Sequence, residues 1–211
     1  AAGLDDGVAE LLAQPFSDEL TRGQAMRFAA LLHDAAKPQT RAVGPNGRVT
    51  FIGHDVAGAE LARDVLGRLR ASGRLRDYVA AIVAHHLDAG FLVHRRPLDR
   101  RTIWRYLRAT QPYSADITIF TVADRLSTRG RNAEAAIAGH LEVARELLAA
   151  ARELEAAGPQ RPLVRGDELI ALGIPAGPRI GEILAQLEED RYAREISTRE
   201  EALARARQLA S

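Results

Sequence analysis

The sequence predicts an all-α protein, and three observations support this fold class. Apolar residues recur at helical spacing along most of the chain. Only one short segment, between two of the expected helices, has the signals of a β-hairpin. Hydrophobic residues make up 46% of the 211 residues, enough to form a buried core. We therefore expect a helical bundle with a small hairpin inserted in it.

The first clear helix precedes the hairpin. Its apolar stripe has the i, i+3, i+4, i+7 spacing and consists of Ala25, Phe28, Ala29 and Leu32. Because Pro38 disfavours helical geometry at the residue before it, we expect this helix to end near Lys37. The hairpin should follow, with strands Thr40–Val43 and Arg48–Phe51 joined by a turn over Gly44–Gly47 that contains Asn-Gly.

Helical periodicity resumes after the hairpin and continues to residue 156. The expected helices are Asp55–Arg70, Leu75–Leu87, Asp99–Ala109, Tyr113–Leu126 and a long one over Asn132–Ala156. The segment Gly158–Pro162 then interrupts the pattern and is the best linker candidate. We expect a main domain over residues 1–158 and a small helical tail over 159–211. The last tail helix should begin at a capping box over Ser197–Glu200.

Composition restricts the chemistry that the protein can use. Cysteine is absent, so disulfides, thiolate zinc sites and cysteine nucleophiles are excluded, and any metal must be held by imidazole and carboxylate groups. The absence of cysteine fits a cytoplasmic setting and no apolar run is long enough to span a membrane, so we expect a cytoplasmic protein without a membrane partner. The formal net charge is +1, so the chain as a whole is not a polycation. Because the chain begins at Ala1 rather than at Met, we expect it to be part of a longer protein.

Five residues form the candidate metal site: His33, Asp34, His54, His85 and Asp124. Neutral imidazole together with carboxylate suits Mn, Fe, Ni, Zn or Mg. Each residue alone has another explanation, because a histidine at a helix end can interact with the helix dipole and an aspartate can pair with a nearby arginine. Their order along the chain, His-Asp, then His, then His-His, then Asp on a later helix, favours the metal site.

Basic residues supply candidate phosphate contacts. Lys37 is the only lysine, and it follows His33 by one helical turn, so it could meet a phosphate oxygen or simply be a solvated helix-end residue. The stretch Arg95–Arg108 holds six arginines with one Trp and one Tyr, and Arg101 and Arg105 in it are candidate RNA contacts, although a solvated arginine face is the alternative. Arg125 and Arg129 follow Asp124 and could contact a phosphate near the metal.

The order of these residues resembles the HD superfamily of metal-dependent phosphohydrolases. A narrower resemblance is to the HD region and C-terminal segment of bacterial CCA-adding enzymes and poly(A) polymerases, the tRNA nucleotidyltransferase family, and it covers nearly all of residues 25–205. The segments that carry it are Leu31–Arg41, Phe51–His54, Gly58-Ala59, Leu69–Ser72, Gly166–Ile170, Gly173 and Gly177–Gly181.

This resemblance implies an HD-type helical bundle, a divalent metal, and a nucleotide or tRNA ligand. Two departures from the family pattern matter. No histidine precedes His33, although HD enzymes carry one on an earlier helix, and Asp5 or Asp6 could stand near that place. The sequence also has no Asp-x-Asp pair after a glycine-rich strand, so the nucleotidyltransferase head would have to lie upstream in the parent protein.

Two functions are therefore expected to compete. In the first, the chain is a metal-dependent phosphohydrolase for phosphate esters of nucleotides or RNA ends. His33, Asp34 and Asp124 bind metal, His54 and His85 hold a second metal or the phosphate, and Lys37 stabilises charge. In the alternative, it is the non-catalytic tRNA-binding body of a CCA-adding enzyme or poly(A) polymerase.

Overall fold

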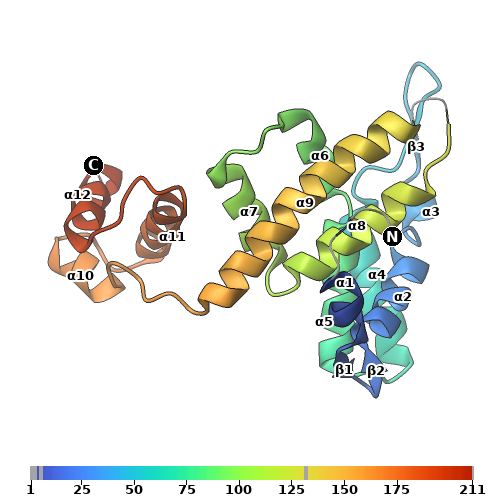
Figure 1. Cartoon of the computed structure of the whole chain (residues 1–211), viewed down its shortest axis with the longest axis horizontal. Coiled ribbons are helices and arrows are strands. Elements are labelled where there is room, and N and C mark those ends of the chain that lie inside the picture. Colours follow the sequence, from blue (N-terminus) through green and yellow to red (C-terminus); the bar gives the residue numbers. More distant parts are fainter. Residues whose placement is uncertain (1–3, 5–6, 131–132, 211) are drawn as a thin grey trace. The chain divides into compact units, whose positions relative to one another are not determined.

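The computed structural model describes all residues except 1–3, 5–6, 131–132 and 211. Helices dominate the described residues, whose strands form two short two-stranded sheets, so the expected all-α fold with a small hairpin is confirmed (Figure 1). In chain order the elements are α1 Gly7–Ala13, β1 Pro15–Ser17, β2 Leu20–Thr21, α2 Arg22–Leu32, α3 Lys37–Thr40, β3 Ala42–Val43, β4 Val49–Thr50, α4 His54–Arg68, α5 Gly73–His85, α6 Asp88–Leu92, the 3₁₀ helix η1 Val93–Arg95, α7 Arg100–Thr110, α8 Ser114–Ser127, α9 Ala133–Ala157, α10 Gly166–Ala171, α11 Pro178–Tyr192 and α12 Arg199–Ala210.

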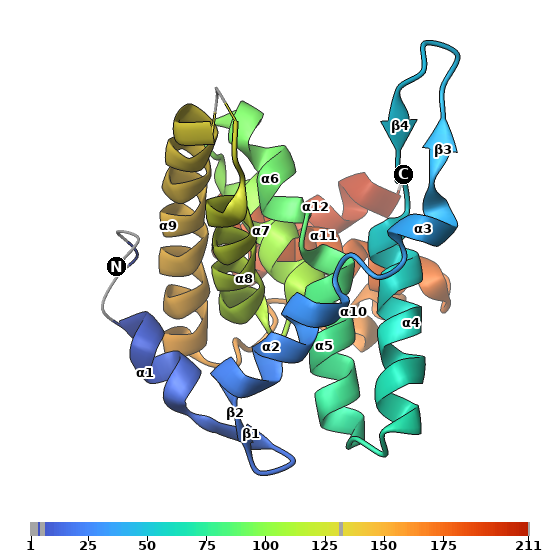
Figure 2. The same cartoon turned by 90° about the vertical axis from the view of Figure 1, so that its right-hand side faces the viewer.

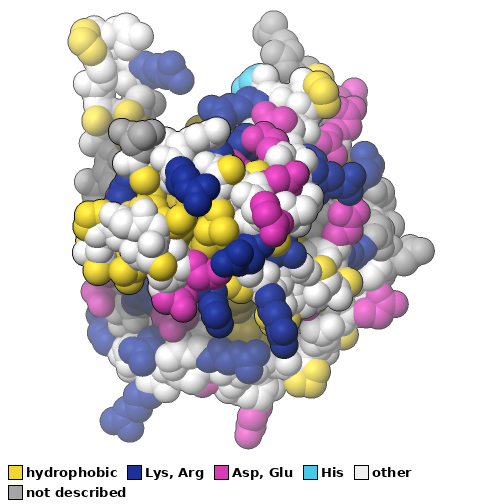
Figure 3. Space-filling model, turned by 90° about the vertical axis from the view of Figure 1, so that its left-hand side faces the viewer, with side chains coloured by type: hydrophobic (Ala, Val, Ile, Leu, Met, Phe, Trp, Pro, Cys, Tyr) yellow, Lys and Arg dark blue, Asp and Glu magenta, His cyan; other side chains and the backbone are white. Residues whose placement is uncertain are grey.

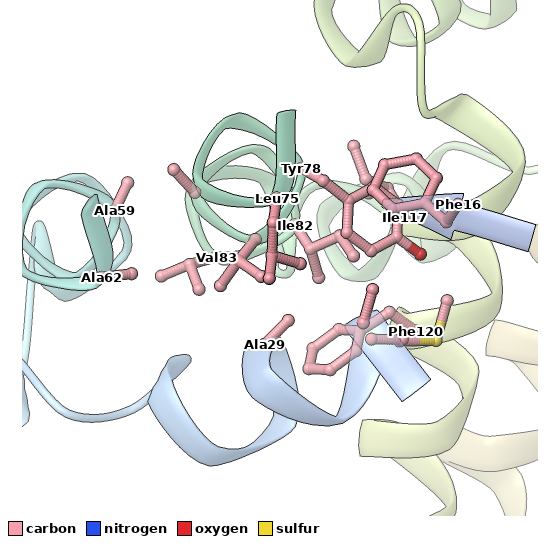
Figure 4. Close-up of a cluster of buried hydrophobic side chains, with 14 of the residues drawn as sticks. Phe16, Ala29, Ala59, Ala62, Leu75, Tyr78, Ile82, Val83, Ile117 and Phe120 are labelled. Carbon is pink, nitrogen blue, oxygen red and sulfur yellow. The ribbon is translucent and has the colours of Figure 1, made fainter. Parts of the chain in front are cut away.

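The chain forms two compact units, and the first comprises Ala1–Pro97 with Thr110–Arg152. Its core surrounds α5, in which Tyr78, Ile82 and Val83 are fully buried. Burying side chains of this size contributes about 1.5–3 kcal/mol each. Figure 4 shows the residues that three other helices contribute to this core, which include Ala29 of α2, Ala59 and Ala62 of α4, and Ile117 and Phe120 of α8.

Small residues let α4 and α5 pack closely. A Cβ atom added at Gly58 in α4 would lie 3.0 Å from Cγ1 of Val83 and 3.5 Å from the carbonyl oxygen of His33. The glycine therefore permits α4 to approach both α5 and the residue that follows α2. Substitution there would push apart the elements that carry the candidate site.

A buried polar network joins α2, α5 and α8. Asp116 accepts hydrogen bonds from the Tyr78 hydroxyl and from the Arg22 guanidinium, both at 2.9 Å. Burial, together with the Asp116 charge, raises the pKa of Tyr78 far above its usual range, so its hydroxyl remains a donor. Because the buried carboxylate has both a hydrogen bond and an ion pair, the network fixes the three helices without an unpaired buried charge.

The hairpin forms at the predicted place. Ala42 pairs with Thr50 and Val43 with Val49 in antiparallel register, and Gly47 in the turn has a φ of +74°, which glycine adopts without strain. Figure 2 shows that this hairpin extends from the side of the molecule where α3 and α4 lie. The other hairpin, β1–β2, was not predicted from the sequence.

The helix before the hairpin ends earlier than predicted. Helix α2 stops at Leu32, and His33 and Asp34 lie in the turn that follows it. The short helix α3 then begins at Lys37, with Pro38 in its first turn. Proline is well tolerated there because the first N–H groups of a helix have no intrahelical partner. Pro38 therefore marks the start of a helix rather than the end of one.

The second compact unit comprises Leu98–Ala109 with Glu153–Ser211. Its core consists of Val164, Leu169, Ile174, Ile183, Leu187, Ile196, Ala202 and Ala206. Most of α7 thus belongs with the tail helices α10–α12. The expected division into domains 1–158 and 159–211 stays a prediction. The cap of α12 is one residue later than predicted, since the Thr198 hydroxyl accepts from the Glu201 N–H and the Glu201 carboxylate accepts from the Thr198 N–H.

Candidate metal centre

Five polar side chains of the first unit converge where four helices begin or end. His33 and Asp34 follow α2, His54 is the first residue of α4, His86 directly follows α5, and Asp124 lies near the end of α8. Gly53, in the left-handed conformation with a φ of +80°, turns the chain into α4 and so places His54. The shared core of these helices therefore fixes where the five side chains meet.

Three of the imidazole rings are held in the same way. In each, Nδ1 faces the backbone carbonyl three residues earlier, His33 to Ala30 at 3.0 Å, His54 to Phe51 at 2.7 Å and His86 to Val83 at 2.6 Å. A carbonyl oxygen only accepts, so each Nδ1 carries the proton and donates it. Nε2 is therefore the ring nitrogen left to bind a metal at the centre, and the hydrogen bond at Nδ1 fixes the orientation of each ring.

The Nε2 atoms lie close to one another and to Asp34. The distance between Nε2 of His54 and Nε2 of His86 is 3.3 Å. Asp34 bridges two rings, because its Oδ1 is 3.5 Å from Nε2 of His54 and its Oδ2 is 3.5 Å from Nε2 of His33. The ligand atoms of Asp34, His54 and His86 all lie within 4.8 Å of one another, so this group could hold a metal ion.

Asp124 approaches the group from α8. Its Oδ1 lies 3.6 Å from Nε2 of His33, and this carboxylate raises the pKa of His33 above its usual range. In turn, the imidazole lowers the pKa of Asp124. A metal that binds Nε2 of His33 must therefore displace a proton that Asp124 stabilises, so metal affinity should increase with pH.

The chemistry of these donors fits a divalent cation. Burial lowers the pKa of His86, so its ring favours the neutral form. His54 and His86 both use Nδ1 as a donor, and their two Nε2 lone pairs would repel each other at 3.3 Å unless a cation or proton lay between them. Two nitrogens and a carboxylate oxygen at such spacing form a donor set for a borderline metal such as Zn, Mn, Fe or Ni.

His85, the residue expected in this site, lies outside the group, and His86 lies in its place. Nδ1 of His85 is 2.8 Å from Oδ2 of Asp88. Successive side chains on a helix point about 100° apart, and at the end of α5 it is His86 whose ring is directed toward His54. Helical spacing did not distinguish the two histidines, because His86 follows Val79 and Val83 at i+7 and i+3 while His85 follows Tyr78 and Ile82 at the same spacings.

Two of the expected phosphate-binding residues lie beside the group. Nζ of Lys37 donates to Oδ2 of Asp34 at 2.6 Å. Arg125 is next to Asp124, and its guanidinium approaches Gly90 of α6. Arg129 instead donates to the backbone carbonyls of residues 126–128 at the end of α8, which is how an arginine commonly stabilises a helix C-terminus. Asp5 and Asp6, considered for the missing first histidine, lie outside the described residues.

Arg101 and Arg105, the candidate RNA contacts of α7, lie in the second unit, where acidic residues bind them. Arg101 contacts Glu189 at 2.9 Å, and Asp190 and Glu195 at 2.6 Å. The Asp190 side chain is 1% exposed, so it requires a partner of this kind. This placement counts against the expected RNA contact of Arg101. Arg105 also contacts Glu189, at 2.7 Å, but its side chain remains 67% exposed.

The chain is similar in sequence to known proteins. A model of the HD domain family matches residues 7–129. Over 182 residues the chain is 37% identical to the CC-adding tRNA nucleotidyltransferase of Thermus thermophilus, a match that covers 84% of this chain and 38% of that protein. It is also 37% identical over 182 residues to the A-adding tRNA nucleotidyltransferase of Deinococcus radiodurans, covering 85% and 40%.

A shorter match reaches a third kind of relative. The chain is 33% identical over 94 residues to the multifunctional CCA protein of Legionella pneumophila, which covers 44% of this chain and 22% of that protein. The chain spans about two fifths of the length of the first two relatives. No helix among the described residues has the length and apolar character to cross a membrane. Since the family match covers more than half of the sequence and includes the converging residues, this chain belongs to the HD domain family.

Proposed function

We propose that this chain is a metal-dependent phosphohydrolase that acts on phosphate esters of nucleotides or RNA ends. The observation that carries the proposal is that the Asp34 carboxylate faces Nε2 of His33 and of His54, while Nε2 of His86 lies 3.3 Å from that of His54. His33, Asp34, His54 and His86 would hold the metal, with Asp124 beside His33. When bound, a divalent metal would lower the pKa of a water molecule and polarise a phosphoryl oxygen.

The protein's own residues would orient and stabilise the substrate. The backbone carbonyls of Ala30, Phe51 and Val83 keep three imidazoles in one tautomer, so the rings need no reorganisation before metal binds. The Lys37 ammonium lies on the Asp34 side of the group, and Arg125 follows Asp124. Lys37 would help to neutralise the charge of a phosphate at the centre, and Arg125 would add positive charge near Asp124.

The test combines metal retention with a substrate panel. Purified protein incubated with Mn or Ni and then dialysed should retain about one metal ion per chain, and it should hydrolyse some member of a panel of 2′,3′-cyclic and terminal nucleotide phosphates. The Asp34→Asn variant, which keeps side-chain size and removes the charge, should lose both properties. Equal trace activity in the parent and Asp34→Asn would mean contamination and would reject the hydrolase.

A second candidate function is a tRNA-binding body without catalysis. It is supported by the identity to two tRNA nucleotidyltransferases, which extends over 84–85% of the chain and therefore includes part of the tail. Nucleic-acid affinity needs exposed cations, and Figure 3 shows basic side chains interspersed with acidic ones on one face of the molecule rather than in one continuous patch. Because the side chains around Asp34 give the first candidate a specific site and no comparable group of described residues carries this one, we rank this candidate second.

Salt dependence of tRNA binding tests the second candidate. The side chains of Arg105 and Arg108 are 67% and 55% exposed, so both can contact phosphates. Replacing both with Ala should flatten the dependence of the tRNA binding constant on salt. Arg63→Ala, an exposed arginine of the first unit, is the matched control and should leave that slope unchanged. An unaltered slope in the double variant would exclude this RNA surface.

A further inference from the structure

Lys37 occupies an unusual position relative to the candidate metal centre. Its ammonium contacts Oδ2 of Asp34 at 2.6 Å, and this is the same oxygen that faces Nε2 of His33 at 3.5 Å. The ammonium also lies 5.8 Å from the centre of the Phe51 ring, within the range of a cation–π contact. Phe51 in turn accepts the Nδ1 hydrogen bond of His54, so the lysine packs against a residue that orients one of the rings.

We propose that Lys37 is a built-in counter-ion of Asp34 that competes with the divalent metal, so that metal binding requires the ammonium to release the carboxylate. The inference rests on the metal site of the proposed function. Asp34 is the central carboxylate of the group, since its two oxygens face two different imidazoles. A dication held by those imidazoles and Asp34 would have to share this carboxylate with a monocation, and the two positive charges repel each other.

The contact is suited to being broken. The Lys37 side chain is 37% exposed and that of Asp34 is 40% exposed, so water screens their attraction. A lysine ammonium can also leave without disturbing the helix, because four flexible methylene groups separate it from the backbone. While the contact is made, the Lys37 ammonium satisfies the Asp34 carboxylate. Once the contact is broken, the ammonium is free to bind an anion.

The sequence offers a direct probe of this exchange. Lys37 is the only lysine in the chain, so protein made with ¹³C-labelled lysine gives the side-chain signal of this residue alone. Titrating the full chain with Zn²⁺, which is diamagnetic, should move the Cε signal toward the position that it has in metal-free Asp34→Asn. The native residue is observed, so this measurement does not depend on whether a lysine variant folds.

Calorimetry gives the second measurement. Lys37→Met retains the length of the side chain without its charge and should bind Zn²⁺ about tenfold more tightly than the parent, because one nearby like charge is removed. Lys37→Arg keeps the charge and is the matched control, whose affinity should stay close to that of the parent. Circular dichroism verifies that each variant is folded.

The outcomes distinguish this inference from the proposed function. Tighter binding by Lys37→Met together with a shift of the lysine signal supports the competition. Metal binding by the parent with an unmoved lysine signal, or with equal or weaker affinity in Lys37→Met, overturns the competition and leaves the metal site intact. If neither the parent nor Lys37→Met binds Zn²⁺, Mn²⁺ or Ni²⁺, the metal site of the proposed function fails and this inference fails with it.

Discussion

His140 is a buried histidine of α9 that the fold holds neutral, and it makes stability depend on pH. Its side chain packs in the first unit, where the residue is 2% exposed. The Thr121 hydroxyl donates to the Thr118 carbonyl at 2.8 Å, so its oxygen accepts from Nε2 of His140 at 2.9 Å. Nδ1 is therefore the unprotonated nitrogen, and it has no hydrogen-bond partner among the described residues.

Protonating this ring would bury a charge whose new N–H has no acceptor. Burial, with a contribution from the Arg125 charge, lowers the pKa of His140 from 6.5 to about 4. Because the pKa of His140 is lower in the folded than in the unfolded protein, the unfolded state binds the proton first as the pH falls. The free energy of unfolding is therefore unaffected by this group above pH 6.5. The free energy of unfolding then decreases as the pH falls from 6.5 through about 4. A shift of this size corresponds to about 3 kcal/mol of unfolding free energy.

Urea unfolding followed by circular dichroism between pH 7.5 and 4 measures this effect. In His140→Leu the pH-dependent loss should be about 3 kcal/mol smaller than in the parent, because the ring that takes up the proton on unfolding is gone. Thr121→Val is the matched control, since it removes the hydrogen-bond acceptor but retains the imidazole, and it should lose about 1 kcal/mol at every pH. Identical pH profiles of the parent and His140→Leu would refute the reasoning.

Three further predictions test other parts of the structure. His86→Ala should remove most of the retained metal, whereas His85→Ala should keep the parent's amount, as measured by elemental analysis after dialysis; equal retention by both variants would place the metal elsewhere. Gly58→Val should destabilise the protein by about 1–3 kcal/mol in urea, because its added carbons meet Val83 at the α4–α5 contact, and an unchanged midpoint would contradict that packing. Asp190→Asn should lower the free energy of unfolding by about 3 kcal/mol, since it breaks a buried carboxylate–arginine cluster in the second unit. The urea dependence of Trp104 fluorescence measures this loss, and a parent-like midpoint would show that the cluster is dispensable.

The sequence by itself determined the features that depend on neighbouring residues. Helical spacing of apolar residues predicted the all-α class, because a helix displays residues three and four apart on one face whatever it packs against. The Asn-Gly pair predicted the hairpin, because the turn needs a residue that tolerates positive φ, and Gly47 supplies it. The adjacency of His33 and Asp34 and their order with His54 and Asp124 indicated the HD family, which the family match confirms.

Tertiary structure decided which of the polar residues share a site. Local pattern recognition selected His85, but only the packing of α5 against its neighbours determines that His86 faces His54. The arginine-rich helix α7 suggested RNA contacts, yet a buried Asp190 distant in sequence binds Arg101. Lys37 could have been a solvated helix end, and its contact with Asp34 depends on where α2 stops. The partners of His86 and Arg101 come from segments distant in sequence, and the contact of Lys37 depends on the exact residue at which a helix ends. Local residue patterns determine neither of these.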